Sequence, residues 1–167
     1  MMARAHPKFA LRPFLPQDAS LLATIFRASI AELTADDYNP SQQEAWAAAA
    51  SDKAAFGERL AKHMTLIATV EGSPVGFASL EGNKTIDMLY VHPAVAGQGV
   101  GAMLCDALEK LAAARGASHL TVEASDTARD FFLHRGFTAE RRNTVSVGNE
   151  WFANTTMQKQ LAEKRSA

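Results

Sequence analysis

Residues 91–101 of the 167-residue chain read VHPAVAGQGVG, with glycine at every second position from Gly97 to Gly101. The apolar segment 86–91 precedes this run, and the helix-forming segment 102–115 follows it. A strand, a glycine loop and a helix start, in that order, present unpaired backbone N–H groups and the positive end of a helix dipole to one point. Because glycine has no Cβ, a bulky anion can approach its backbone. The stretch therefore predicts a binding site for a phosphate or a diphosphate.

Length and composition indicate a single globular domain over residues 1–167, with its core at about 9–160 and frayed ends. Apolar residues make up 47% of the chain, as is typical of a folded domain, and the formal net charge is -1. This charge argues against a nucleic-acid partner and against a polybasic membrane anchor. The single cysteine, Cys105, excludes an internal disulfide framework, and its place in a helical pattern predicts a buried small apolar residue.

Targeting and metal-binding patterns are not evident in the sequence. Residues 1–8 lack the apolar stretch of a signal peptide, and no apolar run approaches ~18 residues, so we expect a cytoplasmic protein that does not enter a membrane. We also expect no bound metal, because the histidines do not have the spacing of metal ligands. Surface or capping roles are expected for His6, His92, His119 and His134.

Hydrophobic periodicity predicts a mixed sheet protein and not a strict alternation of strands and helices. Strands are expected at 9–14, 64–70, 75–80, 84–91, 118–123, 139–147 and 150–159. Helices are expected at 21–33, from Ser41, from Ser51 or Asp52, at 102–115, and around Phe131 and Phe132. The segment 125–127 is expected to cap the last helix, with Thr127 and Asp130 at capping-box spacing. The three strands between residues 64 and 91 form an antiparallel meander in this interpretation.

Two common phosphate-binding motifs fit the glycine run poorly. The P-loop pattern needs a Gly-Lys pair, which the chain lacks. The dinucleotide fingerprint G-x-G-x-x-[GA] is satisfied literally by Gly97, Gly99 and Ala102, and Glu123 stands about twenty residues later, where a ribose-binding acid would be. In that fold, however, the strand leads directly into the first glycine and opens a run of alternating strands and helices. Here five residues, 92–96, intervene and a meander precedes the loop, which disfavours a dinucleotide site.

Residues 96–101, called the glycine loop from here on, resemble motif A of the GNAT superfamily of N-acetyltransferases, which reads [QR]-x-x-G-x-[GA]. A hydrophobic strand that ends in a valine two residues before a proline precedes that motif, as Val91 and Pro93 do here. A second resemblance covers residues 125–137, where Ser125-x-x-Ala-x-x-Phe-Phe-x-x-x-Gly-Phe is similar to the family pattern N-x-x-A-x-x-F-Y-x-x-x-G-F. The order β-α-α-β-β-β-α-β-α-β-β matches the family over nearly the whole chain.

The resemblance implies an α/β protein with a mixed α+β sheet, in the GNAT-like acyl-CoA N-acyltransferase fold. An antiparallel meander would be followed by a splayed parallel pair, strands 84–91 and 118–123, with helices on both faces. The pantetheine arm of acetyl-CoA would lie in the gap between the pair, and the backbone of the glycine loop would hold the diphosphate. The cofactor-binding residues implied in this way are Leu89, Tyr90, Val91, Ala96, Gly97, Gln98, Gly99, Val100, Gly101, Ala102, Ser125 and Phe132.

Two departures from the family pattern bear on catalysis. Ala96 replaces a glutamine or arginine, which removes one side chain from the loop but leaves its backbone intact. Phe132 replaces the tyrosine that often protonates the departing thiolate, and a phenyl ring cannot donate a proton. Either Tyr90, Ser125 or water donates instead, or the thiolate leaves unassisted. For Tyr90, buried packing is the alternative role.

Direct attack of a neutral amine on the acetyl carbonyl would benefit from a base, because only about one part in a thousand of an amine with a pKa near ~10 is neutral at pH 7. Asp87 is the first candidate, since it stands two residues before Leu89 and is expected to share its strand face. A salt-bridged or surface aspartate is the alternative. Weaker candidates are Glu81, Glu123 and His63.

The resemblance implies an acetyl-CoA-dependent N-acetyltransferase that acts on a primary amine of a small molecule or a peptide, as a monomer or a homodimer. The alternative is a non-catalytic CoA-binding or regulatory module with the same fold. Acidic and aromatic residues around the first two helices could attract a cationic amine, or could form a solvated face around one buried tryptophan. These residues are Glu32, Asp36, Asp37, Tyr38 and Trp46.

Overall fold

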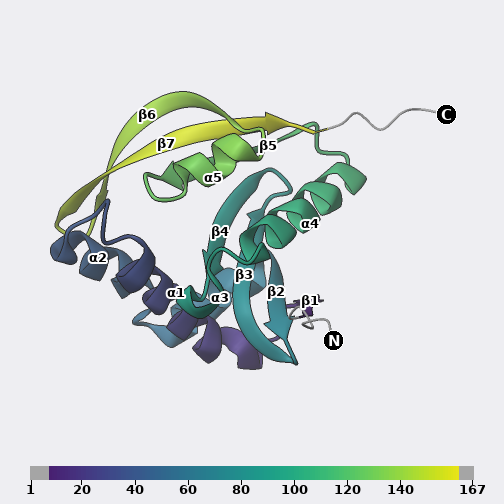
Figure 1. The fold of residues 1–167 in the computed structure, drawn as a ribbon, viewed down its shortest axis with the longest axis horizontal. Helices are drawn as coiled ribbons and strands as arrows, with labels where there is room; N and C mark the ends of the chain where they lie inside the picture. Colours follow the sequence, from purple (N-terminus) through teal and green to yellow (C-terminus); the bar gives the residue numbers. More distant parts are fainter. Residues whose placement is uncertain (1–7, 162–167) are drawn as a thin grey trace, which may run out of the picture.

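A computed structural model describes residues 8–161, which form a seven-stranded sheet with helices on both faces (Figure 1). The strand order is β1-β2-β3-β4-β5-β7-β6. The strands are β1 Phe9–Pro13, β2 Met64–Val70, β3 Ser73–Glu81, β4 Thr85–Val91, β5 His119–Ser125, β6 Thr138–Val147 and β7 Glu150–Gln160. Strands β2 to β4 form the expected antiparallel meander, and β5 joins β4 in parallel, so the predicted mixed sheet is confirmed.

The helices before the meander are α1 Ala19–Leu33, α2 Pro40–Ala47 and α3 Lys53–Lys62, and the last two begin at a side-chain cap. Asn39 caps α2 by accepting a hydrogen bond from the backbone N–H of Gln42 (2.8 Å), and the helix begins at Pro40, one residue before the expected start at Ser41. Asp52, one of the two starts considered for α3, caps this helix by accepting from the N–H of Ala55 (3.0 Å).

The helices after the meander are α4 Val100–Ala114 and α5 Arg129–His134. The capping box expected at Thr127 is wrong, because α5 begins at Arg129 with Ala128 as its N-cap. Ser125 accepts the hydrogen bond from the N–H of Ala128 (3.1 Å), so a turn precedes the helix. The Thr127 hydroxyl is thereby free to donate to Asp37 (2.7 Å), in the loop between α1 and α2.

Two separate apolar cores lie on the two faces of the sheet. Helices α4 and α5 cover one face, where Leu104, Leu108 and Phe132 are buried, and we call it the α4 face. Helices α1 to α3 cover the other, where Phe26 and Phe56 are buried, and we call it the α1 face. Helices α1 to α3 precede the meander in the chain, whereas α4 follows β4 and α5 follows β5, so each face of the sheet is covered by one part of the chain (Figure 1). Among the described helices, none is long and apolar enough to cross a membrane.

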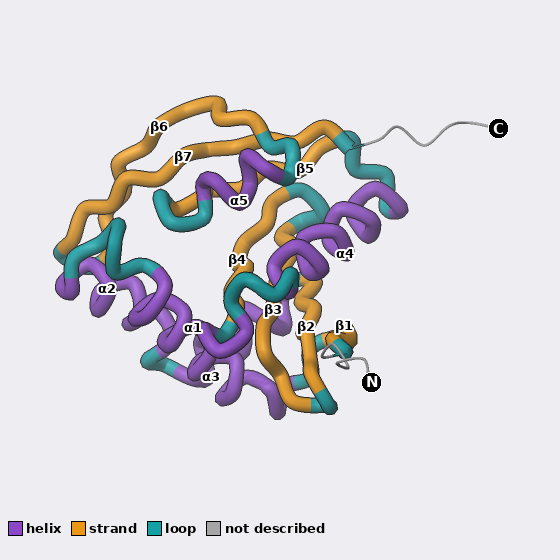
Figure 2. The backbone as a smooth tube through the Cα atoms, in the orientation of Figure 1, coloured by secondary structure: helices purple, strands orange, loops and turns teal. Residues whose placement is uncertain are grey.

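Strands β4 and β5 separate soon after they meet. Their pairing consists of Thr85 with Thr121 and Ile86 with Val122, whereas every other neighbouring pair of strands shares a longer ladder. Beyond Ile86 the two strands diverge, and the tube in Figure 2 shows them together at one end and apart at the other. The splayed pair predicted from the sequence is therefore present.

A β-bulge in β4 reverses the expected direction of one candidate side chain. Ser79 pairs with Met88 and Leu80 pairs with Ile86, so Asp87 is an extra residue without a partner in β3. Leu89 packs on the α4 face, whereas Met88 and Tyr90 belong to the α1 face and Asp87 binds Arg59 of α3. The expectation that Asp87 shares the strand face of Leu89 is wrong, because the bulge breaks the alternation of side chains between them.

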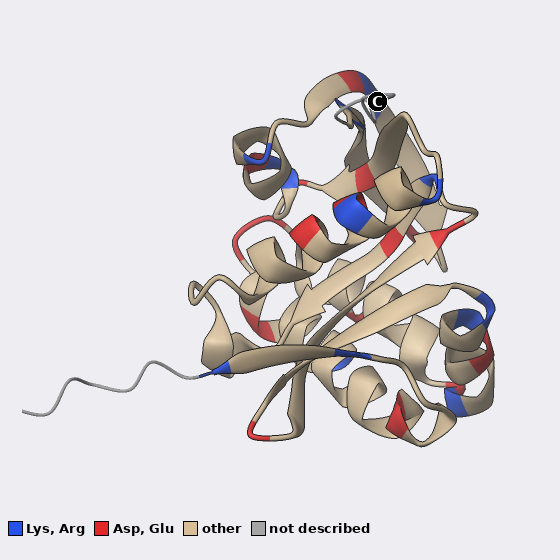
Figure 3. Ribbon diagram, turned by 90° about the vertical axis from the view of Figure 1, so that its right-hand side faces the viewer, with Lys and Arg blue, Asp and Glu red and all other residues tan. Residues whose placement is uncertain are grey.

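Charged residues of both signs are interspersed over the ribbon in the view of Figure 3, in keeping with the formal net charge of -1. Several of them form ion pairs between elements, such as Arg142 with Asp126 and Lys159 with Glu109. An excess of negative or positive charge inside a pocket would therefore reflect the residues that line the pocket and not the net charge of the chain.

Candidate active site

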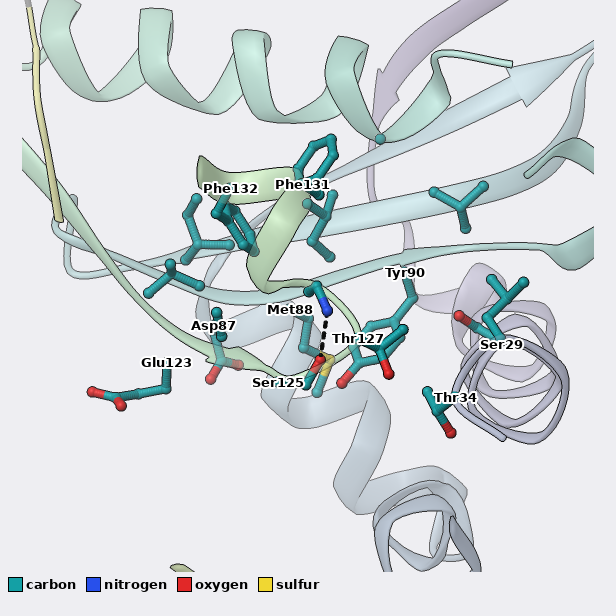
Figure 4. A pocket seen from close by; sticks show the side chains of 18 of the residues that line it. Ser29, Thr34, Asp87, Met88, Tyr90, Glu123, Ser125, Thr127, Phe131 and Phe132 are labelled. Atoms are coloured by element: carbon teal, nitrogen blue, oxygen red, sulfur yellow. Dashed lines mark hydrogen bonds between the residues drawn. The ribbon is translucent and has the colours of Figure 1, made fainter. Parts of the chain in front are cut away.

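A cavity of about 270 Å³ lies where β4 and β5 diverge, and it is called the central cavity below. Its walls come from both faces of the sheet, so it runs through the gap between the two strands. From β4 and β5 it is lined by Ile86, Asp87, Met88, Leu89, Tyr90, Val91, Val122, Glu123, Ala124 and Ser125. From the helices and loops it is lined by Ser29, Leu33, Thr34, Trp46, Gly101, Thr127, Ala128, Phe131 and Phe132 (Figure 4).

The glycine loop ends beside this cavity and leaves several backbone donors unused. The N–H groups of Ala96 and Gln98 donate to carbonyls within the preceding turn, at 3.2 Å each. Among the described residues, no acceptor is found for the N–H groups of Gly97 and Gly99 or for those that open α4, at 100–102. These groups lie at the N-terminal end of a 15-residue helix, where an anion is stabilised.

Two glycines have backbone angles and surroundings that keep the glycine loop accessible to a ligand. Gly97 and Gly99 have φ angles of 77° and 85°, in the left-handed region that other residues rarely adopt. A Cβ built on either would meet no atom within 4 Å, so the space in front of the loop is free for a ligand. Gly101 differs, since a Cβ there would lie 3.6 Å from the ring of Phe131. The residues present thus fit a diphosphate group.

The α4 face of the cavity is apolar. Phe132 is buried at 2% exposure and packs edge-on against Phe137, with ring centroids 5.1 Å apart. Phe131 is half-buried and closes the side nearest Gly101. Ser125, at the end of β5, uses its hydroxyl oxygen to accept from Ala128, which is the dashed bond in Figure 4. Phe132 therefore serves as packing and as cavity wall at once.

On the α1 face, Asp87 is held by a bidentate ion pair. Arg59 of α3 donates from Nε to Oδ2 (2.9 Å) and from Nη2 to Oδ1 (2.8 Å), and this hydrogen bonding raises the pKa of Arg59. His63 Nε2 lies 3.7 Å from Oδ2. The carboxylate of Glu81 is within metal-binding reach of both His63 and Asp87, but Arg59 already occupies both Asp87 oxygens and would repel a second cation. We therefore assign this cluster to an ion pair and not to a metal site.

Tyr90 and Trp46 form a polar contact inside an aromatic cluster. Trp46 Nε1 donates to the hydroxyl oxygen of Tyr90 (3.1 Å), and the Tyr90 ring packs edge-on against Phe26 with centroids 4.7 Å apart. Burial raises the pKa of Tyr90 to about 12, so its hydroxyl keeps its proton at neutral pH. Since Trp46 uses one lone pair of the oxygen, the hydroxyl hydrogen remains available to an acceptor in the cavity.

The weaker candidates for the base lie in different parts of the structure. Glu123 lines the cavity from β5, and its Oε2 accepts from Asn143 Nδ2 (3.0 Å) and Thr156 Oγ1 (2.8 Å). His63 and Glu81 flank Asp87 but do not line the cavity. Cys105 is buried as predicted, and burial raises the pKa of its thiol to about 12, which leaves it unreactive.

Of the residues expected to form an acceptor site, only Trp46 reaches the cavity wall. Tyr38 does not line the cavity but connects the residue after β5 to β7. Its hydroxyl accepts from the N–H of Asp126 (2.9 Å) and donates to the carbonyl of Ala153 (3.1 Å). Asp37 accepts from Thr127 (2.7 Å). Glu32 and Asp36 are exposed and do not line the cavity.

Sequence reasoning missed two polar wall residues, Ser29 on α1 and Thr34 at its C-cap, which are 7% and 5% exposed. Ser29 lies among the buried residues Ile25, Phe26 and Ile30 of the same helix. A small polar residue in the apolar stripe of a helix was thus a usable indication of a cavity. Arg59 was also missed, because nothing local connects it to a strand 28 residues away.

Comparison with known proteins agrees with this architecture. Residues 34–161 match the family model described as "Acetyltransferase (GNAT) domain". The chain is also 35% identical over 147 residues to the uncharacterized N-acetyltransferase YafP of Escherichia coli (strain K12), which covers 88% of this chain and 93% of that protein. A glycine loop with unused backbone N–H groups stands beside a splayed parallel pair, and the chain belongs to the GNAT family of acetyltransferases.

Solved structures show the same fold. The GCN5-related N-acetyltransferase from Rhodopseudomonas palustris, whose description adds "Aminotransferase, Class-II", is 61% identical, with a TM-score of 0.90 and coverage of 96% of this chain and 99% of that one. The PaiA N-acetyltransferase from Thermoplasma acidophilum, in complex with coenzyme A, is 19% identical, with a TM-score of 0.76 and coverage of 92% and 99%. The likeness to PaiA shows the fold alone, and the dinucleotide-binding fold is set aside because the chain belongs to the GNAT family.

Proposed function

We propose that this chain transfers the acetyl group of acetyl-CoA to a primary amine of a small molecule or a peptide, by direct attack in a ternary complex. The observation that carries the proposal is a cavity that is lined from both faces of the sheet and reaches Gly101, the last residue of the glycine loop. The loop would hold the diphosphate, and the gap between β4 and β5 would take the pantetheine arm beside Leu89, Tyr90 and Val91. The amine would enter from the α1 face.

In the proposed reaction, the amine nitrogen forms a bond to the acetyl carbon while the carbon–sulfur bond breaks. Acetyl-CoA supplies an activated thioester for this purpose. The chain's own residues bring the two substrates together, because each would reach the gap from a different face of the sheet. Asp87 would accept the proton that the amine loses, and Arg59 holds its carboxylate in place at the edge of the cavity.

The sulfur must gain a proton, or a hydrogen bond, as it departs. Tyr90 is the proposed donor because Phe132 cannot serve and because its hydroxyl hydrogen is free of protein acceptors among the described residues. Its raised pKa, about 12, keeps the group a donor over the whole working pH range and excludes it as the base. An alkyl thiolate, with a pKa of roughly 8.5, is itself a tolerable leaving group, so this contribution is expected to be modest.

Replacing Tyr90 by phenylalanine is expected to lower kcat about tenfold and to leave the KM for acetyl-CoA nearly unchanged, because the lost hydrogen bond forms as the sulfur departs. Thiol release followed at saturating amine measures both constants. Trp46→Phe is the matched control, since it removes the donor that orients the hydroxyl but keeps the hydroxyl itself, and should lower kcat less. An unchanged kcat in the Tyr90 variant would remove this residue from the mechanism.

The proposed function is tested in two stages. Coenzyme A and acetyl-CoA should each raise the melting temperature by several degrees at concentrations about a hundredfold above Kd. Incubation with acetyl-CoA and a broad panel of amines and N-terminal peptides should then release thiol with at least one of them. If neither ligand raised the melting temperature, the proposal would fail at the level of binding.

A non-catalytic CoA-binding module is the second candidate, and Phe132 in the usual tyrosine position is what favours it. Stabilisation by coenzyme A, without thiol release on any amine of the panel, would select this candidate. The oligomeric state, monomer or homodimer, is measured in the same samples by light scattering.

A further inference from the structure

Given the proposed acetyl transfer, on which this step depends, we infer that the acceptor is a cationic amine with an apolar body and no carboxylate beside its amino group. Glu123 is the residue that selects it. The substrate class follows from three features of the central cavity: the position of its two carboxylates, their unequal pairing, and the nature of the remaining walls.

The two acidic residues follow the last residue pair of β4 and β5, where the gap opens. Because Ile86 pairs with Val122, the next residues along the parallel strands are Asp87 and Glu123, and both line the cavity. Val122 and Ala124 are buried in the core of the α4 face, so Glu123 between them projects to the α1 face, like Asp87. Figure 4 shows both side chains directed away from Phe131 and Phe132. An amine that enters from the α1 face meets both of them.

Their charges are compensated to different extents. Asp87 has a bidentate guanidinium partner in Arg59. Glu123 takes part in no ion pair among residues 8–161, and its hydrogen bonds come from the uncharged donors of Asn143 and Thr156. Both donors bind Oε2, which orients the carboxylate and leaves Oε1 without a protein donor in the same described residues. Glu123 thus presents one negative charge with a free oxygen.

The rest of the wall offers nothing to a second carboxylate. The described lining residues include no lysine, arginine or histidine, and their other polar groups are the hydroxyls of serine, threonine and tyrosine, with the Trp46 indole. An amino acid would place its own carboxylate near Glu123 and Asp87, where the guanidinium of Arg59 is already paired with Asp87. A simple amine of the same shape avoids this repulsion. The apolar and aromatic surfaces, such as Leu33, Trp46 and Met88, suit its hydrocarbon part.

The test compares amines with the amino acids that carry the same side chain: phenylethylamine with phenylalanine, tryptamine with tryptophan, and isoamylamine with leucine. In the wild-type protein, kcat/KM from thiol release should favour the amine about a hundredfold or more in at least one pair. Glu123→Gln should raise the KM for that amine about tenfold and leave the KM for acetyl-CoA unchanged. The ratio of kcat/KM between the amine and its amino acid should fall to about tenfold. The wild-type preference should also weaken as salt is raised.

Glu140→Gln is the matched control, because it removes the same charge from an exposed position on β6 that does not line the cavity. Its ratio of kcat/KM between the amine and the amino acid should equal that of the wild type. Melting temperatures show that both variants are folded. Equal rates within every pair, a preference for the amino acid, or an unchanged preference in Glu123→Gln would overturn the inference. So would the absence of turnover with all three amines, whereas acetyl transfer itself is judged separately on the broad amine panel.

Discussion

Replacing Asp87 by asparagine is expected to lower kcat/KM for the amine by about a hundredfold at pH 7, the range in which a positioned base contributes. The carboxylate lines the cavity at the point where the proposed amine loses its proton, and an amide cannot accept that proton. The loss should shrink as the pH approaches the pKa of the amine, near ~10, because the neutral amine then forms in solution without help. A pH series of kcat/KM, from thiol release at pH 6 to 10, measures this.

The control for this variant separates chemistry from stability. Asp87→Asn also breaks the ion pair with Arg59, so part of any loss could be structural. Arg59→Met breaks the same pair but keeps the carboxylate, and it should lower the melting temperature comparably while costing much less activity. Equal losses of kcat/KM in the two variants, or a loss that does not vary with pH, would show that Asp87 acts through the ion pair and is not the base.

Replacing Gly99 by alanine is expected to weaken coenzyme A binding about tenfold or more. Gly99 has a φ of 85° at the N-cap of α4, and its missing Cβ faces open space in front of the unused N–H groups. A methyl group there would stand where the diphosphate is expected, and the left-handed backbone would cost about 1 kcal/mol in addition. Isothermal titration with coenzyme A measures the affinity.

Gly116 supplies the control at the other end of α4. Its φ is 92°, and a Cβ there would also meet no atom within 4 Å, but it follows the C-terminal end of α4, at the opposite end of the helix from the glycine loop. Gly116→Ala should therefore lower the melting temperature by about the same ~2–4 °C as Gly99→Ala, since the backbone cost is similar, while coenzyme A binding stays at the wild-type level. If the two variants bound coenzyme A equally well, the glycine loop would not be the diphosphate site.

The elements and the glycine loop could be predicted because their determinants are local. Alternation of apolar residues marks strands, a cap such as Asp52 marks a helix start, and glycine permits the left-handed angles at Gly97 and Gly99. Each depends on residues a few positions apart. Together with the second motif at 125–137, these features indicated the family, which the comparisons confirm.

The side-chain arrangement on the α1 face could not be predicted, because it depends on contacts between distant segments. The bulge at Asp87 arises from its pairing with β3, and it turns the carboxylate to Arg59, 28 residues earlier. The Tyr90 hydroxyl meets Trp46 across 44 residues. Glu123 is oriented by β6 and β7, which follow it in the chain.

The amino-acid sequence therefore specifies the glycine loop and the order of strands and helices, since short-range backbone preferences and periodicity are properties of neighbouring residues. The folded chain sets which carboxylate is neutralised and which remains free, because charge pairing is decided by distances of a few ångströms between elements that only the packed sheet brings together. For this protein, the donor side of the proposed reaction could be predicted from local sequence, and the acceptor side required the tertiary structure.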